Sequence, residues 1–259
     1  MEVFLQLMQL HSTQFMTDLS FPPFTFTPVV FAISVTLAGF YLYHYTVTAG
    51  WLHRRLTTET SPTRYWAQRI FTQKIWGFVI MGIVPALLNA TIYNVWPADY
   101  GLHWPHLLNY LHWLLPAFLI PVAINYFMAR NRTTHQNYPQ MRIMQWNSRL
   151  YLINMLGWLL YLTGYEYLFR GILLFTLSMA FGAWPAIAIS VAIYSLAHLP
   201  KGMGETLGAI LFGIIISIIT LYTGTIIFAI LMHWALAVST DYFSIKYNPA
   251  MSFINKNKK

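Results

Sequence analysis

The second half of the chain contains ionisable side chains of the kinds that activate water, and they lie in or beside apolar segments. The set is Glu166, Arg170, His198, Glu205, His233 and Asp241. A carboxylate with an imidazole can remove a proton from water, and a second imidazole can stabilise the oxyanion that then forms. The same groups could instead bind a divalent metal, because His and carboxylate are common zinc ligands.

Each of these residues also has an ordinary structural interpretation. Glu166 and Arg170 are four residues apart, so on a helix they could form a simple salt bridge. His233 could be a hydrogen-bonded core residue, and Glu205 could be an acid favoured in the first turn of a helix. Asp241 lies near the end of an apolar segment and could be solvated. The set favours function because four separate segments bring acids and imidazoles towards one side of a membrane.

The composition predicts that these segments cross a membrane. Of 259 residues, 57% are hydrophobic and 8% are charged, whereas soluble domains contain about 25% charged residues. Apolar stretches approach the roughly 20 residues that a spanning helix needs. They cover residues 28–47, 75–96, 106–128, 150–182, 184–199, 206–223 and 226–243. We therefore predict an all-α, polytopic transmembrane helical bundle with about seven or eight membrane helices.

The basic residues predict the orientation of this bundle. Lys and Arg gather in residues 51–74, in residues 129–149 and in the tail, whereas the N-terminus and residues 97–105 contain none. By the positive-inside rule the N-terminus lies outside and the C-terminus is cytoplasmic. This topology, together with anionic lipid headgroups, explains the net charge of +8, so we expect no nucleic-acid partner.

The segment 150–182 is too long for one ordinary span. Because glycine weakens a helix, the sequence predicts a break at Thr163 and Gly164. The part before the break would dip into the inner leaflet without crossing, which leaves seven full crossings and keeps the tail inside.

Three motifs resemble those of the CAAX-protease and bacteriocin-processing (CPBP, or Abi) family of intramembrane proteases. Residues 165–171, Tyr-Glu-Tyr-Leu-Phe-Arg-Gly, resemble the first signature, which is usually two adjacent glutamates with an arginine four residues after the second. Tyr194 and His198 are similar to the second, an aromatic residue four positions before a histidine. His233 begins a stretch similar to the third, in which an asparagine follows the histidine by four residues. The resemblance covers residues 150–241.

Two positions depart from the family pattern, whereas residues 198–205 and Asp241 resemble a branch of the family with a single glutamate in the first motif. Tyr165 stands where the first glutamate would be, and Ala237 stands where the asparagine would be. We expect Glu166 to serve as the base in such a branch. From charge and depth, Glu205 or Asp241 would supply the missing carboxylate.

The resemblance implies an intramembrane endopeptidase that cleaves a membrane-associated protein or peptide. Glu166 and His198 would hold and deprotonate the attacking water, and Arg170 would orient Glu166. His233, with Asp241, would polarise the carbonyl or stabilise the oxyanion. No cofactor is required by the sequence, although a divalent metal such as zinc is an option, with Glu166, His198 and His233 as its ligands.

The domain organisation follows from the same motifs. Residues 1–149 are expected to form N-terminal transmembrane helices that wall the cavity, residues 150–245 the CPBP-like catalytic core, and residues 246–259 a basic cytoplasmic tail. Membrane lipids are the other expected partner, and a bacterial inner membrane the expected location. A catalytically inactive CPBP-like binding or regulatory protein is the main alternative. A transporter is disfavoured because the two halves of the chain show no internal repeat.

Overall fold

Nearly all the secondary structure that the structure describes is helical. The structure, a computed structural model, describes residues 27–48, 50–52, 61–104, 107–130 and 132–254. The long helices are α2 (Pro28–Thr48), α6 (Leu107–Met128), α10 (Ala183–Leu196), α11 (Met203–Thr223) and α12 (Ile227–Tyr247). Two longer rods each consist of three consecutive segments. The first is formed by α4 (Pro62–Phe78), η1 (Val79–Ile83) and α5 (Val84–Tyr93). The second is formed by α8 (Ser148–Glu166), η2 (Tyr167–Phe175) and α9 (Thr176–Phe181). The short elements are α7 (Arg132–Asn137), η3 (Leu199–Lys201), β1 (Gln145–Trp146) and β2 (Ser252–Phe253).

Several of these helices are suited to a bilayer. Within the described part of the chain, 4 helices are long and apolar enough to cross a membrane, namely Pro28–Val47, Pro62–Tyr93, Met203–Thr223 and Ile227–Tyr247. Shorter apolar helices cover Phe118–Met128 and Ala183–Leu196. Large apolar side chains are exposed on the outside of the bundle, as a lipid-facing surface requires. The predicted all-α transmembrane bundle is confirmed.

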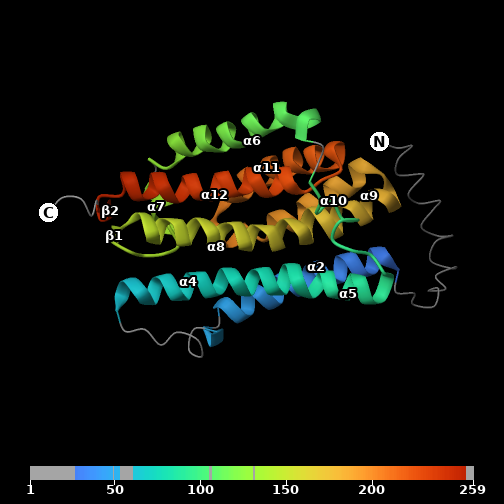
Figure 1. Ribbon diagram of the computed structural model, residues 1–259, viewed down its shortest axis with the longest axis horizontal. Coiled ribbons are helices and arrows are strands. Elements are labelled where there is room, and N and C mark those ends of the chain that lie inside the picture. Colours follow the sequence, from blue (N-terminus) through green and yellow to red (C-terminus); the bar gives the residue numbers. More distant parts are fainter. Residues whose placement is uncertain (1–26, 49, 53–60, 105–106, 131, 255–259) are drawn as a thin grey trace, which may run out of the picture.

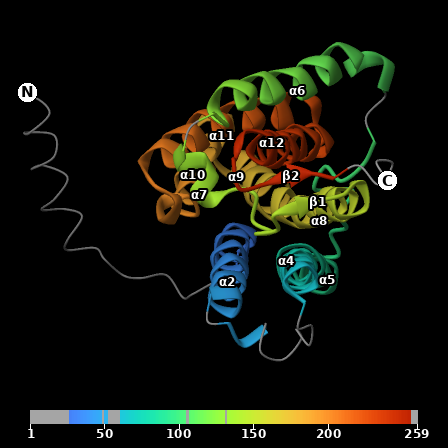
Figure 2. The ribbon, with the colours of Figure 1, turned by 90° about the vertical axis from the view of Figure 1, so that its left-hand side faces the viewer.

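The rod from α8 to α9 forms the centre of the bundle. Figures 1 and 2 show it between the α4–α5 rod on one side and α12 on the other, with α2 beside α4–α5 and α6 outermost beyond α12. It runs from the end of the molecule that carries β1 to the opposite end, and α12 returns from there to β2 (Figure 1). Strand β1, which precedes α8, pairs in parallel with β2, which follows α12, through Gln145 with Ser252 and Trp146 with Phe253. This pairing connects the start of α8 to the chain after α12.

The predicted break at Thr163 and Gly164 is wrong. The helix continues through both residues, and its three segments of 19, 9 and 6 residues follow one another without a gap. Gly164 is needed for close packing instead: a Cβ atom there would lie 3.0 Å from the Cα atom of Phe78 and 3.2 Å from the backbone nitrogen of Gly82. Small residues allow two membrane helices to approach to backbone contact in this way.

This continuous rod changes how the membrane crossings are counted. At about 1.5 Å per residue, the rod is roughly 50 Å long. A continuous helix of this length crosses a hydrocarbon core of roughly 30 Å once, and the remainder extends beyond the core. No inner-leaflet dip is needed.

Two stretches expected to be loops contain regular structure. Residues 62–74, assigned to a basic loop, form most of α4, because this helix extends beyond its apolar part. Residues 129–149 contain the short helix α7 and the strand β1. The side chains of Met141, Ile143 and Trp146 pack with Ile70 and Ile245 in a small core that fixes this segment to α4 and α12.

Candidate active site

Glu166 and His233 form the central contact of the candidate site. Glu166 is the last residue of α8 and is fully buried, and His233 lies two turns into α12. The Oε1 atom of Glu166 lies 2.5 Å from Nδ1 of His233. The rings of Tyr165 and Phe212 lie edge-on to the imidazole, with ring centroids at 5.8 and 5.3 Å. A carboxylate and an imidazole 67 residues apart in sequence are thus in direct contact inside the bundle.

Arg170 lies on the other side of the Glu166 carboxylate. Its Nε atom is 3.4 Å from Oε2 of Glu166, and both side chains are completely buried. Its guanidinium group stacks over the ring of Tyr194, 4.0 Å from the ring centroid. A buried carboxylate needs a compensating charge, and Arg170 provides it. The expected i, i+4 contact is therefore present in addition to the contact with His233.

His198 lies close to this group but does not join it. Its Nδ1 atom is 3.2 Å from the carbonyl oxygen of Tyr194, one turn before it. Its ring packs on the Tyr194 ring at 4.8 Å, and the same Tyr194 ring lies 6.5 Å from that of His233. Tyr194 thus contacts Arg170 and both imidazoles. From the sequence, Tyr194 is identified only as a motif partner of His198, with no function of its own.

The partners of the two imidazoles determine which nitrogen is available for chemistry. A carbonyl or carboxylate oxygen can only accept a hydrogen bond, so Nδ1 carries the proton in both His198 and His233. In the neutral form the Nε2 atom of each ring is then an acceptor. Such an atom can receive a hydrogen bond from water and take its proton.

The two positions that depart from the family pattern lie within the same region. Tyr165 is almost fully buried, and its hydroxyl group has no hydrogen-bond partner among the described residues. Ala237 is one helical turn beyond His233 and packs with Trp158 and Leu162. An apolar contact therefore occupies the position of the expected asparagine.

Glu205 belongs to a separate cluster at the start of α11. Its carboxylate accepts hydrogen bonds from Asn137 at 3.1 Å and from Tyr138 at 3.3 Å, and it lies 3.7 Å from Nζ of Lys201. Burial raises the pKa of Tyr138, although the charge of Lys201 opposes this. Partial burial disfavours the charge of Lys201, but Tyr138 and Glu205 outweigh this effect and raise its pKa. Lys201 therefore stays protonated, and Glu205 is paired with it.

Asp241 belongs to a second buried cluster. Its Oδ2 atom accepts hydrogen bonds from Asn154 at 2.7 Å and from the indole of Trp158 at 2.6 Å. The ammonium group of Lys74 lies 2.9 Å from the centre of the Trp158 ring, and Lys74 is buried as well. Asp241 is eight residues beyond His233, or about 12 Å along α12. In the sequence, Lys74 stands at the end of a polar stretch that is expected to be a loop, so its contact with Trp158 is not predicted.

The three possible metal ligands are not gathered into one group in the described part of the chain. Across the described ranges, no three His, Cys, Asp or Glu side chains lie together in a group that could hold a metal ion. Glu166 and His233 are paired with each other, whereas His198 contacts Tyr194. The binding of a divalent metal by these residues stays a prediction.

Comparison with known families connects this site to proteolysis. Residues 147–239 match the family described as "Type II CAAX prenyl endopeptidase Rce1-like". The chain carries an Rce1-like domain. This domain contains Glu166, Arg170, His198 and His233, whereas Asp241 lies just beyond its end. No curated protein and no solved structure matches the chain.

The match confirms the resemblance to the CPBP family, and its limits agree closely with residues 150–241. The Rce1-like domain comprises α8 to α11 and most of α12, which are the elements that supply the candidate site. Together with the apolar helices, the match indicates an integral membrane protein that is similar to CPBP-type intramembrane proteases over residues 147–239.

Proposed function

We propose that this protein is an intramembrane endopeptidase that hydrolyses a peptide bond in a membrane-associated substrate. The observation that carries this proposal is the 2.5 Å contact between Glu166 and His233 inside the Rce1-like domain. A carboxylate that fixes an imidazole through Nδ1 leaves Nε2 free to act as a general base.

The proposed reaction uses His233 first as a base and then as an acid. Nε2 of His233 takes a proton from a water molecule, and the water oxygen bonds to the carbonyl carbon of the substrate. The C–N bond then breaks, and the proton passes from His233 to the leaving nitrogen, which gives a carboxyl and an amine product. Glu166 stabilises the imidazolium ion between these steps. Arg170 keeps Glu166 in its charged form and orients it.

His198 has a supporting role in this scheme. Its Nε2 atom is an acceptor, so it can hold the second hydrogen of the attacking water rather than donate to an oxyanion. Tyr194 keeps the two imidazoles at a fixed separation by packing against both rings. Glu205 and Asp241 are paired with other residues, and the scheme assigns them no step.

The orientation follows from the basic residues. The end of the bundle with β1, β2 and α7 carries Arg142, Arg149 and Lys246, and we assign it to the cytoplasm. The N-terminus is then outside and the C-terminus inside, in a membrane that we take to be the bacterial inner membrane.

A second candidate function is a catalytically inactive protein that uses the same fold for binding or regulation. It is favoured by Tyr165 and Ala237, which replace the expected glutamate and asparagine and pack against apolar side chains such as Phe169 and Leu162.

The decisive experiment is cleavage of membrane-anchored reporter peptides, prenylated and unprenylated, by the full chain in liposomes. Glu166→Gln and His233→Phe are the test variants, because glutamine retains the size of the carboxylate and phenylalanine retains the ring between Tyr165 and Phe212. Glu205→Gln is the matched control, since it removes an acid from the same domain outside the contact. Each variant is checked for folding by thermal unfolding.

Cleavage that is lost in both test variants and retained in the control supports the protease. Absence of cleavage by the wild type, with full biological activity of both folded test variants, supports the inactive protein instead. A chelator added to the wild type tests the expected metal separately.

A further inference from the structure

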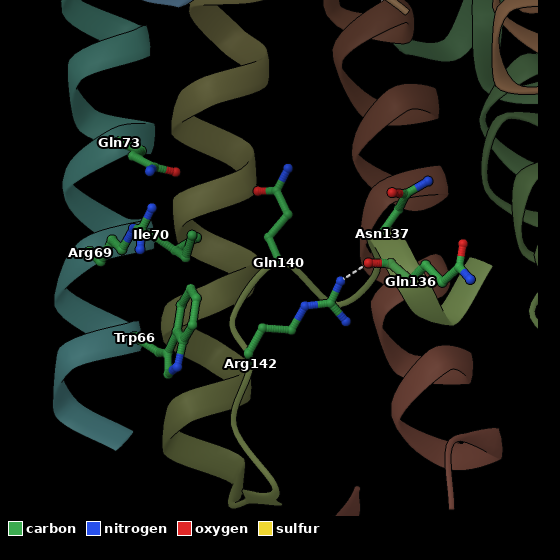
Figure 3. A pocket seen from close by; sticks show the side chains of 8 residues that line it. All are labelled: Trp66, Arg69, Ile70, Gln73, Gln136, Asn137, Gln140 and Arg142. Atoms are coloured by element: carbon green, nitrogen blue, oxygen red, sulfur yellow. Dashed lines mark hydrogen bonds between the residues drawn. The ribbon is translucent and has the colours of Figure 1, made fainter. Parts of the chain in front are cut away.

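A polar pocket lies away from the candidate site, between α4 and the segment that follows α6. It has a volume of about 340 Å³ and is lined by Trp66, Arg69, Ile70, Gln73, Gln136, Asn137, Gln140 and Arg142. Figure 3 shows α4 on one side of it and the chain from Gln136 to Arg142 on the other. Its volume falls at the lower end of the roughly 300–1,000 Å³ that small-molecule sites occupy.

The lining of this pocket favours an anion. It includes two guanidinium groups and four side-chain amides, and none of the four acidic residues in the described part of the chain lines it. The Nε atom of Arg69 is buried and has no hydrogen-bond partner among the described residues. Its Nη1 atom donates to the hydroxyl of Tyr65 at 3.2 Å, and no carboxylate lies within ion-pair distance of Arg69 in the described part of the chain. Guanidinium and amide N–H groups are the usual donors to phosphate oxygens.

The second guanidinium group gives the pocket a fixed shape. Arg142 donates to the carbonyl oxygens of His135, at 2.8 Å, and of Gln136. Figure 3 shows its side chain extending from the chain between α7 and β1 towards Gln136 and Asn137. Arg142 thus fixes the wall of the pocket and contributes positive charge, while Arg69 retains unused hydrogen-bonding capacity.

The depth of the pocket identifies the source of the anion. From Ile75 to Tyr93 the rod has no charged residue, a length of about 28 Å at 1.5 Å per residue, close to a hydrocarbon core of roughly 30 Å. Gln73 and Arg69 lie about 3 and 9 Å beyond its cytoplasmic end. The headgroup layer extends roughly 5–8 Å beyond the core on each side. Gln73 therefore lies within the headgroup layer and Arg69 at its outer edge, so a lipid headgroup can reach the pocket.

We propose that this pocket binds the phosphate group of an anionic phospholipid from the inner leaflet. Arg69 is the main charged contact, and the amides of Gln73 and Gln140 supply further donors. The proposal is independent of proteolysis, because none of these residues contacts the Glu166–His233 pair. An inorganic phosphate ion has the same chemistry, so the test includes it as a competitor.

The test is native mass spectrometry of the purified full chain, titrated with short-chain phosphatidylglycerol and, separately, with short-chain phosphatidylcholine. Arg69→Gln is the test variant and Arg149→Gln the matched control, because Arg149 is an exposed arginine at the same end of the molecule that does not line the pocket. Arg69→Gln is expected to weaken phosphatidylglycerol binding at least about ten-fold, which is the effect of losing one hydrogen bond to a charged group. Arg149→Gln and phosphatidylcholine binding are expected to show no such change.

Equal phosphatidylglycerol binding by the wild type and Arg69→Gln would overturn the proposal. An equal loss in Arg149→Gln would also overturn it, since general surface charge would then account for the binding. Displacement of the lipid by inorganic phosphate at equal concentration would identify a free-anion site and overturn the lipid assignment. If Arg69→Gln fails to fold, Gln140→Met replaces it, with the same selective loss as the expected result.

Discussion

Replacing Gly164 with alanine is expected to destabilise the protein, although alanine is the better helix former. The new methyl group would lie 3.0 Å from the Cα atom of Phe78 and 3.2 Å from the backbone of Gly82. These neighbours are backbone atoms, so they cannot rotate away, and the α4–η1 rod has to move from α8.

The size of the effect follows from two opposing terms. A glycine-to-alanine change inside a helix contributes about 1 kcal/mol of stabilisation. Overpacking at a close contact costs about 1–3 kcal/mol. Gly208 offers a matched control, since it also lies inside a long helix, and a Cβ atom there has nothing within 4 Å. Gly164→Ala should therefore be about 1–3 kcal/mol less stable than Gly208→Ala.

Thermal unfolding of both variants in the same detergent measures this difference. For a chain of this size, each kcal/mol shifts Tm by roughly 2–4 °C, so Gly164→Ala should unfold roughly 2–12 °C below Gly208→Ala. Because Glu166 is only two residues further on, Gly164→Ala should also reduce any cleavage activity. Equal Tm values for the two variants would show that Gly164 is a flexible break and not a packing contact, and would refute this reasoning.

Three further substitutions test the buried charges, each by thermal unfolding against the wild type. Arg170→Met leaves Glu166 without its compensating charge and should cost about 3–5 kcal/mol; a change below 1 kcal/mol would mean that the ion pair is not buried as described. Asp241→Leu removes the acceptor of two buried hydrogen bonds, from Asn154 and from the indole of Trp158, and should cost about 1–3 kcal/mol; a change below about 0.5 kcal/mol would mean that these bonds do not stabilise the folded state. Glu205→Gln breaks a partly exposed pair and should change stability by less than about 1 kcal/mol; a larger loss would assign Glu205 to the core.

The apolar helices could be predicted from hydropathy, but the polar N-terminal part of α4 could not. Its first turns contain Arg64, Gln68, Arg69 and Gln73, which resemble a loop in a hydropathy profile. They are helical because the rod continues past the hydrocarbon layer into the headgroup region, where polar side chains are solvated. The break expected at Gly164 failed for a related reason: glycine propensity is a local property, whereas the closeness of Gly82 depends on the tertiary packing.

The centre of the candidate site was accessible to sequence analysis, and its surroundings were not. Arg170 follows Glu166 by one helical turn, so their contact depends only on helix geometry. The contact with His233 could be expected only from the order of the motifs. Charge and depth brought Glu205 and Asp241 into the same set, but depth does not indicate which side of a helix faces a site. Their hydrogen-bond partners, Asn137 and Tyr138 for Glu205 and Asn154 and Trp158 for Asp241, come from distant segments that only the three-dimensional arrangement brings together.

The most direct test of the account is to follow the oxygen atom of the attacking water. The wild type and the folded Glu166→Gln variant are incubated in liposomes with a membrane-anchored reporter peptide in ¹⁸O-labelled water, and the products are analysed by mass spectrometry. We predict one ¹⁸O atom in the new C-terminal carboxyl group with the wild type and no product with Glu166→Gln. Cleavage by Glu166→Gln at the wild-type rate, or a wild-type product without ¹⁸O, would contradict hydrolysis by the Glu166–His233 pair.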